Sequence, residues 1–146
     1  MKHLCPRTAL IAVISILFFA CTRSTPEATA TQAKTEPETL SRTEFAGRVE
    51  NYFEYEPLHA GKASPFRIHL TDMSDGSPVE NAEVTLAVRG KGSGDAVAQT
   101  TARFGKVTGI YVAELNIPRA GNYDIEFHIK NDKLDERMPL SDFKVE

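Results

Sequence analysis

Strict alternation of apolar and polar residues is the feature that most limits the folds open to this chain. In residues 65–71 the side chains of Phe66, Ile68 and Leu70 alternate with polar ones, and a second run of the same kind covers residues 83–89. A period of two places the apolar side chains on one face of a strand and the polar side chains on the other. Both runs are therefore predicted to be strands with one buried face.

Other segments show the same pattern and are separated by turn residues such as Asp75-Gly76 and Gly105-Lys106. Further strands are expected at 48–56, 96–104, 109–117, 123–129 and 138–145. The run 96–104 is mostly small and polar, which is typical of an edge strand. About seven short strands with regular turns predict an all-β protein, specifically an immunoglobulin-like β-sandwich. Tyr123 follows Gly121-Asn122, which suggests a tyrosine corner, with the hydroxyl bonded to nearby backbone.

The N-terminal segment looks like an export signal. Residues 9–20 form an uncharged apolar run that is too short for a bilayer but has the length of a signal-peptide core, and Cys21 follows directly. Leu17-Phe-Phe-Ala-Cys21 resembles a bacterial lipobox, although Phe18 and Phe19 depart from its usual residues. Residues 1–21 are therefore expected to be a lipoprotein signal peptide, with lipid attached to Cys21. A plain secretory signal, or an uncleaved anchor with an incidental cysteine, is the alternative.

The composition changes after Cys21. Residues 22–44 are rich in Thr, Ala, Pro and Glu and nearly lack large apolar residues, so we expect a disordered linker there and a folded domain over 45–146. By resemblance to lipoprotein sorting in enteric bacteria, Thr22 in place of aspartate favours the outer membrane over the inner one. The domain is then expected to face the periplasm on a membrane anchor.

Composition also excludes several functions. The net charge is −3 and no basic stripe is present, so a nucleic-acid partner is not expected. Both cysteines, Cys5 and Cys21, precede the folded part, which rules out a disulfide framework there. No GxSxG motif and no histidine beside a nucleophile occurs. The domain is therefore expected to be non-catalytic and to need no cofactor.

The residues around the turns resemble a known family. Pro57-Leu58, Ala60-Gly61, the strand end His69–Asp72 and Ala120-Gly121-x-Tyr123 are similar to the N-terminal β-sandwich domain of periplasmic adaptor subunits from heavy-metal RND efflux pumps, and to small YtkA-like domains. This resemblance implies an accessory to heavy-metal or copper handling, with an efflux-pump component as an envelope partner. The helical hairpin, lipoyl-like half and barrel domain of an adaptor have no counterpart here, so the chain corresponds at most to the isolated module.

The metal association makes a few side chains worth weighing, because imidazole and thioether groups suit Cu(I) or Ag(I) and imidazole suits Zn(II). They are His59, His69, His128, Met73 and Met138. None of them shows an HxH, MxxM or HExxH spacing. If a metal binds, the expected ligands are His69 and His128, provided that their strands are neighbours. The alternative is that both are ordinary solvated histidines on polar strand faces.

The predicted edge strand 96–104 offers a second kind of site. An exposed edge can recruit an extended segment of another protein by β-augmentation. Ala96, Gln99 and Thr101 are the expected contact residues. Two functions from different classes remain at this stage: an accessory to metal efflux, and a structural or protein-interaction lipoprotein without any metal or ligand role.

Overall fold

The computed structural model describes residues 38–146. The expected signal peptide, Cys21 and residues 22–37 of the expected linker lie outside the described residues. All nine strands and the buried core belong to one compact unit, Thr35–Glu146. We therefore expect this unit to fold on its own. No helix in residues 38–146 has the length and hydropathy needed to cross a membrane.

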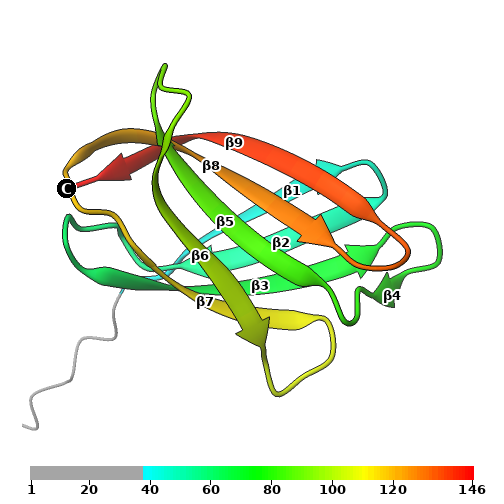
Figure 1. Ribbon diagram of the computed structural model, residues 1–146. Coiled ribbons are helices and arrows are strands. Elements are labelled where there is room, and N and C mark those ends of the chain that lie inside the picture. The colour runs from blue at the N-terminus through cyan, green and yellow to red at the C-terminus, as the bar shows by residue number, and fades with distance from the viewer. Residues whose placement is uncertain (1–37) are drawn as a thin grey trace, which may run out of the picture. The chain divides into compact units, whose positions relative to one another are not determined.

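The described part of the chain is built from β-strands and turns (Figure 1). The strands are β1 (Leu40–Ala46), β2 (Val49–Tyr55), β3 (Ala63–Asp72), β4 (Ser77–Pro78), β5 (Glu83–Gly90), β6 (Ala96–Phe104), β7 (Ile110–Asn116), β8 (Gly121–Lys130) and β9 (Asp135–Val145).

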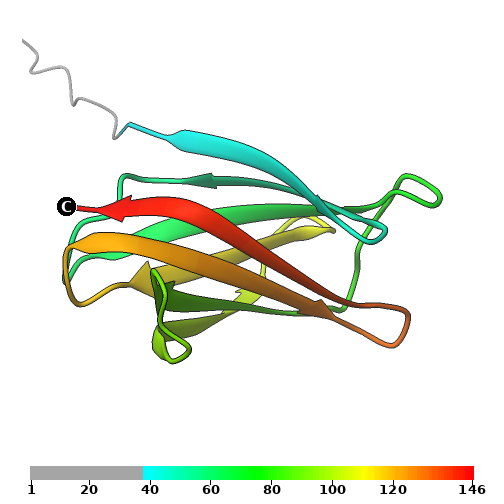
Figure 2. The same ribbon diagram turned by 90° about the horizontal axis from the view of Figure 1, so that it is seen from above.

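The strands form an antiparallel sandwich, as the sequence predicted. The pairing order is β1-β2-β3-β7-β6-β5-β8-β9, with the short β4 beside β3. Strands β1, β2, β3 and β7 make one layer, and β5, β6, β8 and β9 make the other (Figure 2). The layers are joined where β6 meets β7 at two residues, Arg103 and Phe104. A parallel bridge between Leu58 and Val145 ties them at another point.

The core lies between the two layers and consists of the residues that the alternation predicted. Each of the four long inner strands points every second side chain inward, so that at most a few per cent of it is exposed. These residues are Phe66, Ile68 and Leu70 of β3, Val84, Leu86 and Val88 of β5, Tyr111, Ala113 and Leu115 of β7, and Ile125, Phe127 and Ile129 of β8. Phe53 of β2 reaches across the interior, with its ring 4.9 Å from that of Phe127.

The tyrosine corner is confirmed. The hydroxyl of Tyr123 donates a hydrogen bond of 2.9 Å to the backbone carbonyl of Arg119, four residues earlier. The ring is largely buried against the core. Tyr123 therefore has a structural role at the entry to β8.

Two strands differ from the sequence-based expectation. The expected domain start at residue 45 falls inside β1, which begins at Leu40, in the segment expected to be linker. This strand shows little apolar alternation. It is held in place by pairing with β2 over its whole length and by contacts of the Arg42 side chain. The Arg42 guanidinium lies 4.9 Å from the centre of the Phe143 ring and donates to the Ser141 carbonyl at 3.0 Å. The other addition, β4, has only two residues.

Candidate functional site

The two histidines expected to share a metal lie in different layers of the sandwich. His69 is on β3, whose partners are β2, β4 and β7, whereas His128 is on β8, whose partners are β5 and β9. Each alternates with inward-facing core residues, so the two imidazoles point away from the core on opposite outer faces. The prediction of a shared site was therefore wrong. Its condition, that the two strands are neighbours, is not met.

Each histidine has its own surroundings. His128 Nε2 is 2.6 Å from the Asp135 carboxylate, which also accepts a hydrogen bond of 2.8 Å from Lys130. The His69 ring packs edge-on against Tyr52 at 5.3 Å between centroids, and its Nε2 lies 3.9 Å from the Glu54 carboxylate.

The remaining candidate metal ligands are not gathered either. Met138 is buried, and its sulfur accepts a weak contact of 3.7 Å from the amide of Asn51. Met73 and His59 are exposed on separate loops. Within residues 38–146, no three His, Cys, Asp or Glu side chains are close enough together to hold a metal ion.

The contacts of Asp135 with His128 and Lys130 make the stability of the domain depend on pH in the acidic range. Hydrogen bonds from Lys130 and then His128 lower the pKa of Asp135 from its ordinary value of 3.8 to about 2. A carboxyl group with a lowered pKa stabilises the folded state above its unfolded pKa, and this contribution disappears as the pH falls through the folded pKa. We therefore expect Asp135→Asn to lower stability at pH 5, and the difference from wild type to shrink as the pH falls from 4 to 2 and to disappear below pH 2.

Urea unfolding of both proteins across this pH range measures the effect, which salt will weaken because the side chains are exposed. Asp95→Asn is the matched control, because the Asp95 carboxylate makes no ion pair within the described residues. Parallel pH curves for Asp135→Asn and wild type would contradict the expectation.

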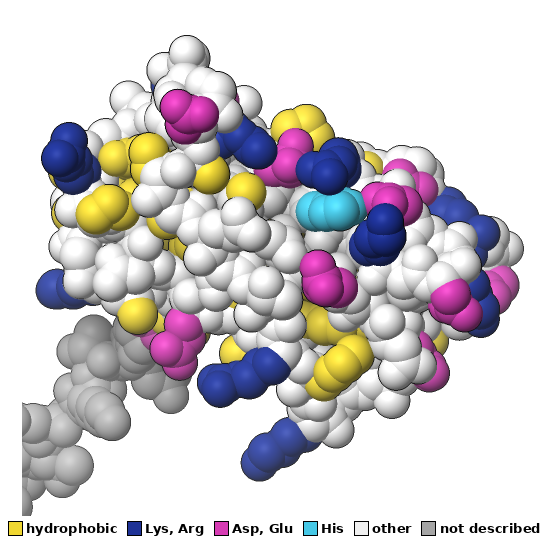
Figure 3. Space-filling model, viewed as in Figure 1, with side chains coloured by type: hydrophobic (Ala, Val, Ile, Leu, Met, Phe, Trp, Pro, Cys, Tyr) yellow, Lys and Arg dark blue, Asp and Glu magenta, His cyan; other side chains and the backbone are white. Residues whose placement is uncertain are grey.

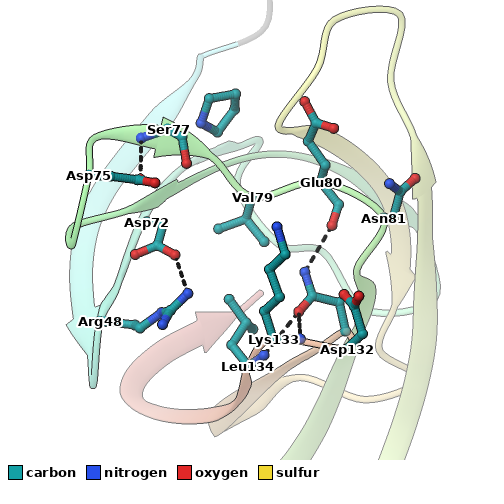
Figure 4. A pocket seen from close by; sticks show the side chains of 12 residues that line it. Arg48, Asp72, Asp75, Ser77, Val79, Glu80, Asn81, Asp132, Lys133 and Leu134 are labelled. Atoms are coloured by element: carbon teal, nitrogen blue, oxygen red, sulfur yellow. Dashed lines mark hydrogen bonds and ion pairs between the residues drawn. The ribbon is translucent and has the colours of Figure 1, made fainter.

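A polar hollow of about 400 Å³ lies at one end of the sandwich, between the β3–β5 connection and the β8–β9 turn (Figure 4). Figure 4 shows Lys133 extending from the turn towards Val79, with the Arg48–Asp72 pair on one side. The turn is fixed by Asn131, whose amide donates to the Glu80 carbonyl at 2.9 Å.

Two of the four carboxylates that line this hollow, those of Asp72 and Asp75, are already engaged. Hydrogen bonds from the Ser74 side chain and backbone lower the pKa of Asp72, with a further contribution from Arg48. Those from Ser77 lower the pKa of Asp75 in the same way. The lining residues include one hydroxyl, that of Ser77, and no histidine to activate it. We therefore assign this hollow a structural role in joining the two loops.

The predicted edge is present along most of β6. Ala96 and Ala98–Ala102 pair with β5 on one side, with a bulge at Val97. The other side of this segment has no strand partner, because β7 is paired only at Arg103 and Phe104. Figure 1 shows β6 and β7 diverging from their common turn. The side chains of Ala96, Gln99 and Thr101 are all exposed, as expected for contact residues.

A second surface was missed by the sequence analysis. A hollow of about 540 Å³ lies on the outer side of β3 and β7, beside the β6–β7 turn. It is lined by Arg67, His69, Arg103, Phe104, Gly105, Lys106, Val107, Ile110 and Val112. Figure 3 shows hydrophobic side chains beside Lys and Arg side chains at the lower edge of the view, over the end of β6 and its turn. The sequence hint was the pair of apolar residues, Phe104 and Val107, that brackets the turn Gly105-Lys106.

Comparisons of the chain with family models, with curated proteins and with solved structures found no match.

Proposed function

We propose that this protein is a non-catalytic binding module of the cell envelope, and that it recruits an extended segment of a partner protein to the free edge of β6. The observation that carries the proposal is the one-sided pairing of Ala96–Ala102. Backbone N–H and C=O groups alternate sides along a strand, so about every second residue of this segment offers an unpaired donor and acceptor to an added strand.

The edge strands β1 and β9 contain charged residues or proline that the Ala96–Ala102 segment of β6 lacks. Exposed edges usually carry charges, proline or bulges, because these features prevent pairing with other chains. The sequence of β1 contains Arg42 and Glu44, and that of β9 contains Pro139 and a backbone irregularity at Asp142, whose φ is 70°. In contrast, the segment AVAQTTA of β6 has no charge and no proline, and its one irregularity is a bulge at Val97, near the start of the strand. An edge without charge or proline beyond the bulge leaves Ala98–Ala102 open to pairing with an added strand.

The N-terminal segment and the family resemblance complete the proposal. Lipid on Cys21 anchors the domain to a membrane, and the residues after Cys21 tether it on the periplasmic side. By the resemblance to lipoprotein sorting, Thr22 favours the outer membrane. The resemblance to efflux adaptors makes an efflux-pump component the first partner to test. The separation of His69 and His128 favours a role through protein contact over direct metal binding. The alternative is a structural or protein-interaction lipoprotein of the envelope that has no metal or ligand role and binds its partner at the same β6 edge.

Site-specific cross-linking in intact cells tests this function. A photoreactive amino acid is placed at Gln99 or Thr101 of the full chain, and at Thr43 as the matched control. Thr43 is also an exposed threonine on an edge strand, but it lies on β1 at the far end of the pairing order. We expect one discrete cross-linked protein from both β6 positions and none from Thr43. Equal cross-linking from all three positions, or none from β6, would overturn the proposal.

A further inference from the structure

We infer that the segment added to β6 continues into the hollow beside the β6–β7 turn, so that the partner segment carries an Asp or Glu and a large apolar residue next to its pairing stretch. This inference rests on the proposed function, since it specifies the chemistry of the partner bound at the β6 edge. Three features of the surface support it: continuity, charge and exposed apolar area.

The free edge leads directly into the hollow. Pairing of β6 with β7 begins at Arg103, so an added strand cannot continue in the ladder past Ala102. A small hollow of about 190 Å³ lies at this point, and its lining includes Thr100, Arg103, Val112 and one acidic residue, Glu114. Arg103 and Val112 also line the larger hollow of about 540 Å³. A chain leaving the β6 edge therefore has a continuous depression to follow across the outer face of β7.

The larger hollow has the charge to hold an anionic side chain. Arg67, Arg103 and Lys106 line it, and no Asp or Glu does, although the described part of the chain is acidic, with 13 Lys and Arg against 18 Asp and Glu. The Arg67–Glu54 and Arg103–Glu114 distances are 3.7 and 3.9 Å, too long for hydrogen bonds. Lys106 makes no ion pair within residues 38–146. Lys106 is therefore free to pair with a carboxylate, and the two arginines, which are in ion pairs without hydrogen bonds, keep donors that a carboxylate can accept from.

The same hollow exposes apolar surface that binding would cover. Phe104 and Val107 are each 61% exposed, and they stand at the two ends of a turn fixed by backbone hydrogen bonds from Gly105 and Ile110. Large apolar side chains that are grouped on a surface mark interaction sites. The surface is concave, and this shape favours an inserted side chain over contact with a flat lipid bilayer.

Selection from a peptide library tests the inference. Random 12-residue peptides displayed on phage are selected on the unit Thr35–Glu146. We expect the recovered peptides to place an Asp or Glu and an aromatic or aliphatic residue beside an uncharged β-branched run. The double variant Arg103→Glu/Lys106→Glu should weaken a recovered peptide by about tenfold or more. The matched controls Lys62→Glu and Lys133→Glu, at exposed lysines outside the hollow, should bind as wild type does.

A proline scan separates this inference from the proposed function. Backbone N–H groups alternate sides along a strand, so one of Thr100→Pro and Thr101→Pro removes a donor on the open side and keeps the bonds to β5. The proline variant that keeps the bonds to β5 is the one whose circular dichroism spectrum is the same as that of wild type. This folded variant should lose peptide binding.

The outcomes decide between the two claims. Peptides that depend on β6 but tolerate charge reversal in the hollow would overturn the inference and leave the proposed function intact. Peptides that bind the folded proline variant as well as wild type, or failure to recover any, would overturn both. Binding to vesicles of phosphatidylethanolamine and phosphatidylglycerol that is lost on charge reversal, without selection of acidic peptides, would make the hollow a membrane contact and overturn the inference.

Discussion

Replacing Phe53 with alanine should lower the free energy of unfolding by about 3–5 kcal/mol, the usual cost of removing a buried phenylalanine ring. Phe53 is completely buried, and its ring lies 4.9 Å from Phe127, 6.1 Å from Phe66 and 6.4 Å from Phe143. It therefore connects β2 and β3 of one layer to β8 and β9 of the other. A small domain is stable by only about 5–15 kcal/mol, so this one change removes a large share of that stability.

Urea unfolding of the unit Thr35–Glu146, followed by circular dichroism, measures the effect. Phe45→Ala is the matched control, because Phe45 is 61% exposed on β1 and loses little packing when truncated. Equal loss of stability in the two variants would contradict the central place of Phe53 in the core.

The prediction of the fold succeeded where local pattern and tertiary burial agree. The alternation in β3, β5, β7 and β8 reflects one buried and one exposed face, so it appears in the sequence whatever the topology. The sequence of strand β1 shows no such alternation. It depends on backbone pairing with β2 and on the contact of Arg42 with Phe143, a residue about a hundred positions away in the chain. A contact between residues so far apart cannot be predicted from a short stretch of sequence.

The candidate sites depended on topology, which alternation does not determine. The pattern placed His69 and His128 correctly on the outward faces of their strands, but it did not say which strands are neighbours. The order places β7 beside β3 and β8 beside β5, which separates the two histidines and brings Arg67 of β3 close to Arg103 of β6 around the same hollow. The β6 edge was predictable because its residues are mostly small and polar and lack the apolar alternation of the buried strands.

Replacing Gly109 with alanine should destabilise the domain more than the same change at another glycine of similar backbone conformation. Gly109 has a φ of +77°, in the left-handed region, and its carbonyl accepts a hydrogen bond of 3.0 Å from the Leu70 backbone N–H. A Cβ atom there would lie 2.5 Å from the Pro78 Cβ and 3.3 Å from the Leu70 carbonyl oxygen. Two costs therefore add: about 1–2 kcal/mol for the left-handed conformation and about 1–3 kcal/mol for the forced contact.

Gly92→Ala separates these two costs. Gly92 has a φ of +80°, but a Cβ atom there meets nothing within 4 Å, so only the conformational cost applies. We expect Gly109→Ala to lose more stability in urea than Gly92→Ala, and the difference measures how firmly β4 and the start of β7 are held together. If the two variants lose the same stability, Pro78 moves freely out of the way. The β3–β5 connection would then be loosely packed against β7, and the turn that shapes one side of the proposed binding hollow would lack a rigid support.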